Sequence, residues 1–127
     1  MNAPRLRQLA NLAPQLATAA TESAAYWSPE PPPLTTLAAD LAHALASNVG
    51  HLPPSTLHSA FELCEAAIVE GSAEEQAAFA TGFLEALQHA DGRGEFDFRS
   101  IAPFLGAASK AHCEGMDSFH GARTRGL

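Results

Sequence analysis

The densest group of potential metal ligands lies towards the C-terminus: His112, Cys113, Asp117 and His120, with Glu114 among them. On a helix, Cys113, Asp117 and His120 share a face because they are four and three residues apart. Thiolate, imidazole and carboxylate groups bind zinc, so one hypothesis is a metal-dependent enzyme. No C-x-x-C or H-E-x-x-H pattern accompanies them, and we favour the alternative of ordinary surface and core residues. We therefore predict no metal and no cofactor.

The other histidines raise the question of a Ser–His–Asp triad, because serines and aspartates are also available. They are scattered over different predicted elements: His43, His51, His58 and His89. The chain has no glycine pattern typical of a nucleophile elbow. We interpret these histidines as partly exposed residues near helix ends.

Paired carboxylates are a third source of chemistry. Glu62 and Glu65 have the spacing found in half of a carboxylate-bridged di-metal bundle, which pairs Glu with Glu-x-x-His. Here Glu85 precedes His89 by four residues rather than three, so we interpret the glutamates as an acidic stripe beside an apolar face. A P-loop, a dinucleotide fingerprint and an EF-hand loop are also missing, and we predict that the protein is not an enzyme.

The stretch 72–87 is the element around which the other helices are expected to pack. Ser72 and Glu75 have the spacing of a capping box, and Phe79 and Phe83 begin an apolar face with a four-residue repeat. Gly82 in mid-helix costs about 1 kcal/mol relative to Ala. Such a cost indicates that another helix approaches closely at this point.

Apolar periodicity predicts further helices on both sides of this stretch. The β-branched aliphatic residues that strands favour are restricted to Val49, Val69, Ile68 and Ile101. The predicted helices are 4–23 (kinked or split at Pro14), a helix capped by Thr35 or Thr36 and ended by Asn48 and Gly50, 55–70, 73–89, a short helix after Asp97 or Ser100, and 107–120. Residues 95–98 alternate like a strand, but we predict an extended lead-in.

The 127 residues are predicted to form a single helical domain, 1–127, with a Pro-rich linker at 28–33 and a frayed tail at 122–127. The expected fold is all-α: a compact bundle of five or six helices with a central antiparallel pair, 55–70 and 73–89. The predicted core consists of Leu41, Leu45, Leu57, Phe61, Cys64, Ile68, Phe79, Phe83, Leu84, Leu87, Ile101, Leu105 and Phe119.

Charge is distributed unevenly along a chain whose net charge is −7. Between Gln8 and Gly92 there is no Lys or Arg, but there are ten acids: Glu22, Glu30, Asp40, Glu62, Glu65, Glu70, Glu74, Glu75, Glu85 and Asp91. A nucleic-acid-binding protein shows the opposite pattern. The span is either a solvated acidic surface or a negative face for a basic protein partner.

The compartment is inferred from cysteines and hydropathy. Two cysteines, Cys64 and Cys113, do not make a secreted disulfide scaffold. No apolar run approaches the roughly 18 residues of a membrane span. Arg5 and Arg7 precede a mildly apolar run, but polar residues and Pro14 interrupt it, so we predict a cytoplasmic protein without membrane contact.

Three segments resemble a family of small bacterial helical proteins. They are E-L-C-E-A-A-I-V-E-G-S (62–72), A-T-G-F-L-E-A-L-Q (80–88) and F-D-F-R-S-I-A-P-F-L-G (96–106), about a third of the chain. The family looks like the small partner proteins found beside secreted bacterial toxins. The resemblance implies an immunity role, in which the protein binds and blocks a cognate toxin, and it transfers no catalytic residue.

The leading hypothesis is therefore an immunity protein that occludes a toxin with a basic surface. The residues expected to meet Lys and Arg of the toxin are Glu62, Glu65, Glu70, Glu74, Glu75 and Asp91. Tyr26 and Trp27 are the expected aromatic anchor, since such residues dominate interfaces. The alternative is a helical adaptor or regulatory module, followed by the metal-dependent enzyme. The toxin's identity and the oligomeric state stay open.

Overall fold

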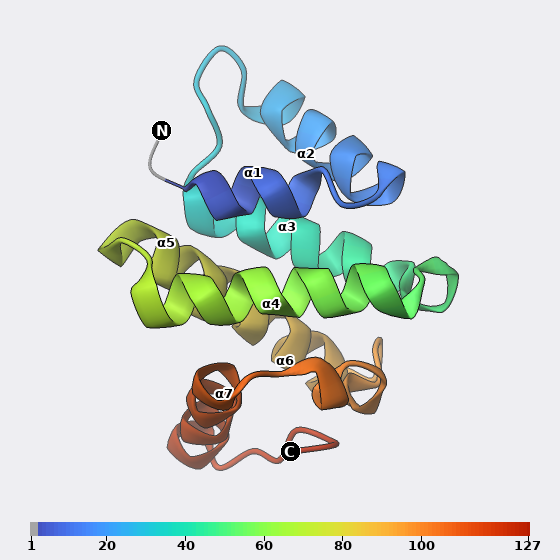
Figure 1. The fold of residues 1–127 in the computed structure, drawn as a ribbon, viewed down its shortest axis with the longest axis vertical. Coiled ribbons are helices and arrows are strands. Elements are labelled where there is room, and N and C mark those ends of the chain that lie inside the picture. Colours follow the sequence, from blue (N-terminus) through green and yellow to red (C-terminus); the bar gives the residue numbers. More distant parts are fainter. Residues whose placement is uncertain (1–2) are drawn as a thin grey trace.

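The computed structural model describes residues 3–127, which fold into an all-α bundle, as predicted (Figure 1). No strand occurs in this described part of the chain. Helices α1 and α2 lie at one end of the long axis and α7 at the other, with α3 and α4 between them. The elements are α1 (Pro4–Ala10), α2 (Pro14–Trp27), α3 (Leu34–Ser47), η1 (Val49–His51), α4 (Pro54–Glu70), α5 (Ala73–Ala77), η2 (Ala78–Leu84), α6 (Glu85–Gly92), η3 (Phe98–Ser100), η4 (Ala102–Phe104) and α7 (Ala107–His120).

Three helices begin at a proline: Pro4, Pro14 and Pro54. Proline suits the first helical position because the missing N–H has no intrahelical acceptor there. Pro14 splits the N-terminal helix into α1 and α2. The prediction of a threonine cap for α3 is wrong, since this helix begins at Leu34 without a side-chain cap.

Helices α5, η2 and α6 form one continuous helix from Ala73 to Gly92, whose middle, η2, is a π-helical segment. Its start is capped as predicted: the Ser72 hydroxyl accepts a hydrogen bond from the Glu75 amide at 3.1 Å. A Cβ on Gly82 would lie 2.6 Å from the Thr35 carbonyl oxygen and 2.8 Å from Ala38 Cβ. The predicted close approach of another helix is thus confirmed, and that helix is α3.

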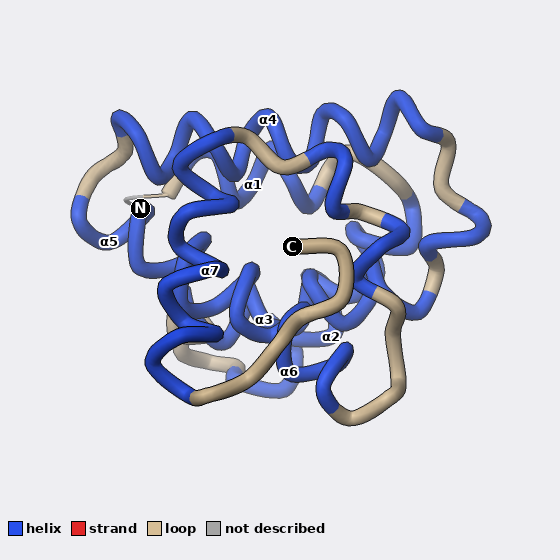
Figure 2. The backbone as a smooth tube through the Cα atoms, turned by 90° about the horizontal axis from the view of Figure 1, so that it is seen from below, coloured by secondary structure: helices blue, strands red, loops and turns tan. Residues whose placement is uncertain are grey.

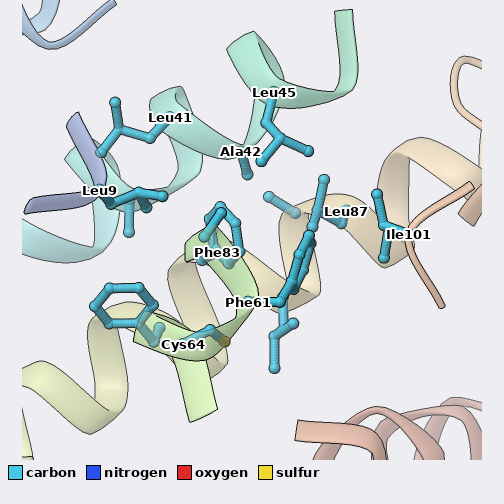
Figure 3. Packing of buried hydrophobic residues seen from close by; sticks show 14 of the residues in the cluster. Leu9, Leu41, Ala42, Leu45, Phe61, Cys64, Phe83, Leu87 and Ile101 are labelled. Atoms are coloured by element: carbon cyan, nitrogen blue, oxygen red, sulfur yellow. The ribbon is translucent and has the colours of Figure 1, made fainter. Parts of the chain in front are cut away.

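The core lies between α3, α4 and this long helix (Figure 3). A two-residue turn joins α4 to α5, and Phe61 of α4 packs against Phe83 with ring centroids 5.6 Å apart. Phe79 meets Phe83 edge to face at 5.9 Å. Each of these buried rings contributes about 1.5–3 kcal/mol of hydrophobic stabilisation.

The predicted core is confirmed for most of its members. Ile68 and Leu105 are only partly buried and pack against its edge. Phe119 was wrongly placed, because its side chain is 82% exposed. Helix α7 instead buries Ser109 and Cys113. Six residues separate Cys113 from Phe119, which puts Phe119 about 120° away around the helix.

The C-terminal tail is docked, which corrects the predicted frayed end. Thr124 is buried, and its amide and hydroxyl both donate to the Asp117 carboxylate at 2.7 Å. Figure 2 shows the tail leaving α7 and running back across the molecule. Polar side chains on α6 and α7 therefore hold a segment whose terminal position suggested fraying.

Two connections complete the fold. Residues 28–33 join α2 to α3 and include a cis Ser28–Pro29 peptide bond. Beyond α6, the Asp97 side chain accepts from the Arg99 amide at 3.0 Å and caps η3. No helix in residues 3–127 is long and apolar enough to cross a membrane.

Candidate functional site

An exposed aromatic pair stands at the C-terminal end of α2. Tyr26 is 84% exposed and Trp27 is 37% exposed, and they are the only Tyr and the only Trp of the chain. Their ring centroids lie 5.9 Å apart in an edge-to-face arrangement. Aromatic residues are enriched at protein interfaces because they bury a large apolar area, so this pair marks a candidate binding surface.

A groove of about 520 Å³ runs beside this pair, between α2 and α3. Glu22 on α2 and Asp40 on α3 both line it, and neither forms an ion pair or a side-chain hydrogen bond within residues 3–127. The other lining residues are Ala19, Ser23, Tyr26, Trp27, Thr36, His43, Ala44 and Ser47. The groove therefore offers two unpaired acids and two aromatic rings to a cation.

Ser23 adds an unusual feature to this groove. The residue is 5% exposed, and its hydroxyl has no hydrogen-bond partner in the described part of the chain. An unsatisfied buried polar group costs about 1–3 kcal/mol. The hydroxyl can both donate and accept, so a bound molecule that reaches it would gain a hydrogen bond.

A second hollow lies on the other side of α3, between this helix and the long helix. Thr36, Asp40 and His43 line both hollows, since they form the outward face of α3. The second one also includes Gly82 of the π-helical segment and Arg93. Asp40 is thus reachable from both sides of α3.

Glu65, predicted to bind a partner, is engaged inside the fold. Its carboxylate accepts hydrogen bonds from the amides of Ala108 and Ser109 and caps α7, with both N···O distances 2.9 Å. A Cβ on Gly106 would collide with this carboxyl group, so a larger residue there would displace the cap. Burial raises the pKa of Glu65, but the bonds from Ala108 and Ser109 outweigh it and the net pKa is lowered.

Glu75 is likewise committed, because it is only 2% exposed and binds Arg5. The Arg5 amide donates to Glu75 Oε2 at 3.0 Å, and Nη1 donates to Oε1 at 2.5 Å. The other guanidinium nitrogen of Arg5 lies 2.9 Å from Glu70, which stays largely exposed. Arg5 thus ties α1 to the turn between α4 and α5.

Asp91 is the third predicted acid that points inward. Its carboxylate accepts from the Phe98 amide at 2.9 Å and from Arg125 Nε at 2.8 Å. Arg125 also donates to the Phe96 carbonyl at 2.8 Å. Three of the six predicted acids, Glu65, Glu75 and Asp91, are therefore engaged in contacts within the fold.

The remaining predicted acids are exposed but lie away from the aromatic pair. Glu62 is on α4, 3.5 Å from His58, while Glu70 and Glu74 flank the turn before α5. None of the three lines the groove that holds Tyr26 and Trp27. The structure thus separates the predicted acidic set from the predicted aromatic anchor.

Two of the four residues considered as metal ligands have other partners. His112 Nε2 lies 3.1 Å from Glu85, and Asp117 binds the tail through Thr124. Cys113 is buried, which together with nearby carboxylates raises the pKa of its thiol to about 12. No group of three His, Cys, Asp or Glu residues within 3–127 is placed to hold a metal ion.

Sequence reasoning missed Glu22, Ser23 and Asp40. A usable signal was present, because Glu22 and Ser23 precede Tyr26 and Trp27 by four residues each. Residues at this spacing are neighbours on a helix surface, so an exposed aromatic pair brings both to its own face. The contribution of Asp40 depended on the packing of α3 against α2.

No family model matches this chain, and comparisons with curated proteins and with solved structures give no match. The resemblance of residues 62–72, 80–88 and 96–106 to toxin partner proteins therefore stays a prediction.

Proposed function

We propose that this protein is a non-enzymatic binding protein whose α2–α3 groove receives a basic surface of another protein. The observation that carries the proposal is the exposed Tyr26–Trp27 pair beside Glu22 and Asp40, two acids without a partner in residues 3–127. Aromatic anchors supply affinity at an interface, and unpaired carboxylates select cationic partners.

The specific form of the proposal is an immunity protein that acts in the cytoplasm and covers the basic substrate cleft of a cognate toxin. Two sequence features support it: the absence of Lys and Arg between Gln8 and Gly92, and the resemblance to toxin partner proteins. Glu62, Glu70 and Glu74 then extend the negative field around the contact, and such fields accelerate association.

Co-purification tests this proposal. The tagged protein is expressed with the product of the neighbouring reading frame and recovered at low and at high salt. We expect stoichiometric capture at low salt that weakens at high salt, because screening shortens the range of exposed charges. Absence of capture at either salt would contradict the immunity role and favour a helical adaptor.

Trp27→Ala locates the contact in the same experiment, with Phe119→Ala as its matched control. Both side chains are exposed aromatic residues on helices, but Phe119 lies on α7, outside the groove. We expect Trp27→Ala to cost about 2 kcal/mol or more in binding, the scale of an interface hot spot. Equal losses of affinity from both substitutions would show that the groove is not the binding site.

A further inference from the structure

We infer that the α2–α3 groove is built for an arginine side chain carried on an extended segment of the partner protein. This inference depends on the proposed binding function and specifies the chemistry of the partner. It combines three features of the groove: unpaired carboxylates on both helices, exposed rings and an unsatisfied hydroxyl.

The carboxylates come from opposite walls. Glu22 belongs to α2 and Asp40 to α3, and no Lys or Arg within residues 3–127 lines this groove. Arg93 lines the hollow on the far side of α3 and forms no ion pair with Asp40. The only other ionisable side chains lining this groove are His43 and Tyr26. A cation lying between the two helices therefore meets negative charge on both sides.

The rings favour a guanidinium over an ammonium group. Guanidinium is planar, stacks on aromatic faces and is more weakly hydrated than the ammonium of Lys. Tyr26 and Trp27 stand edge to face, so their combined surface presents both a ring face and a ring edge beside the groove. A flat cation can stack there while its N–H groups reach a carboxylate in a bidentate manner.

The Ser23 hydroxyl is the third feature. It belongs to a residue that lines the groove and is nearly buried, and it has no partner in residues 3–127. Guanidinium carries five N–H donors in a fixed fork, more than one carboxylate can accept. The oxygen is buried, so it meets an occupant of the groove only after the Ser23 side chain rotates about its Cα–Cβ bond. A spare N–H would then satisfy it, whereas an apolar occupant would leave it unsatisfied.

The size of the groove indicates that the arginine arrives on a chain. About 520 Å³ of open space exceeds what one side chain fills, and ligand sites span roughly 300–1,000 Å³. Asp40 and His43 also line the hollow on the far side of α3. An extended segment can therefore cross α3 with its arginine seated on the α2 side.

Trp27 provides the readout, because it is the only Trp of the chain and borders the groove. The protein is titrated with three capped pentapeptides that alternate glycine with arginine, lysine or glutamate, and Trp fluorescence is recorded. We expect a saturable change with the arginine peptide, weaker binding of the lysine peptide and none of the glutamate peptide. Equal affinities for arginine and lysine, or no saturable response to arginine, would overturn the inference.

Two substitutions distinguish a specific arginine-binding site from general electrostatic attraction to an acidic protein. Asp40→Asn is expected to weaken binding of the arginine peptide roughly tenfold, which is the scale of one charge-assisted hydrogen bond. Glu114→Gln removes the same charge from α7, where the carboxylate has no partner in the described chain, and is expected to leave the affinity unchanged. Equal effects would show that only net charge matters and would contradict the inference.

Ser23→Ala distinguishes a binding role of this hydroxyl from a structural one, because binding and thermal stability are measured separately. Removing an unsatisfied buried hydroxyl is expected to leave the melting temperature unchanged or raised, while binding of the arginine peptide weakens. Unchanged affinity for the arginine peptide would show that the hydroxyl does not contact the arginine and would overturn the inference. If the Ser23→Ala and Asp40→Asn variants still capture the neighbouring gene product, the proposed function stands but the arginine site is rejected.

Discussion

Arg125 Nε lies 2.8 Å from Asp91 Oδ1, and this ion pair fastens the C-terminal tail to α6. The Asp91 side chain is buried whereas the arginine is partly exposed, so the aspartate depends on its partner for compensation. An acid predicted to face a toxin thus serves to close the fold.

Arg125→Ala is expected to destabilise the protein by about 1–3 kcal/mol, because a buried carboxylate loses its cation but keeps the Phe98 amide. Urea unfolding measures the change. Arg123→Ala is the control, since Arg123 is exposed and forms no ion pair within residues 3–127; a change within about 0.5 kcal/mol is expected. Equal stability of both variants would contradict the docked tail.

Gly82→Ala is expected to destabilise the protein although alanine is the better helix former. The new Cβ would meet the Thr35 carbonyl oxygen at 2.6 Å, and overpacking costs about 1–3 kcal/mol against a propensity gain of about 1 kcal/mol. Gly115→Ala on α7 is the matched control, because nothing lies within 4 Å of its added Cβ. We expect that variant to be more stable in the same thermal melts. A stabilised Gly82→Ala would refute the close approach of α3.

Glu65→Gln tests the cap of α7 through pH. Glu65 has a pKa below its ordinary value of 4.5, so the folded state favours the carboxylate. Its contribution to the free energy of unfolding is fully present above that ordinary value and is lost as pH falls through the lowered pKa. The stability gap between wild type and Glu65→Gln should therefore be constant near neutral pH and shrink below about pH 4.5. A gap that is independent of pH would argue against the charged cap.

Thiol titration tests the buried cysteines. Burial raises the pKa of both Cys64 and Cys113, and both side chains are inaccessible in the fold. We expect no reaction with a disulfide reagent at pH 8 in the native state and two thiols after unfolding. Rapid reaction of one thiol in the native state would contradict the burial of the cysteines.

Local signals in the sequence were sufficient for the helix that begins at Ala73. The Ser72 cap, the Phe79–Phe83 repeat and the cost of Gly82 each depend on neighbours a few residues away, and each predicted feature is found. Phe119 was misplaced because helix periodicity shows which residues share a face but does not show which face packs against the rest of the chain.

The candidate site was harder to predict because the fate of an acid depends on distant partners. Glu75 is paired by Arg5, 70 residues away, and Asp91 by Arg125, 34 residues away. No helical pattern encodes such contacts. Tyr26 and Trp27 could be singled out from the sequence, whereas Asp40 lies beside them only through the packing of α3 on α2.

We propose that the acids of the groove, rather than those near α5, meet the partner. The most direct test is the association rate with the neighbouring gene product at low and high salt. Glu22→Gln/Asp40→Asn is compared with Glu70→Gln/Glu74→Gln, which removes the same charge. We predict that the groove variant slows association, weakens its salt dependence and shortens the lifetime of the complex, while the second variant changes only the rate. Equal lifetimes for both variants and wild type would contradict the groove as the binding site.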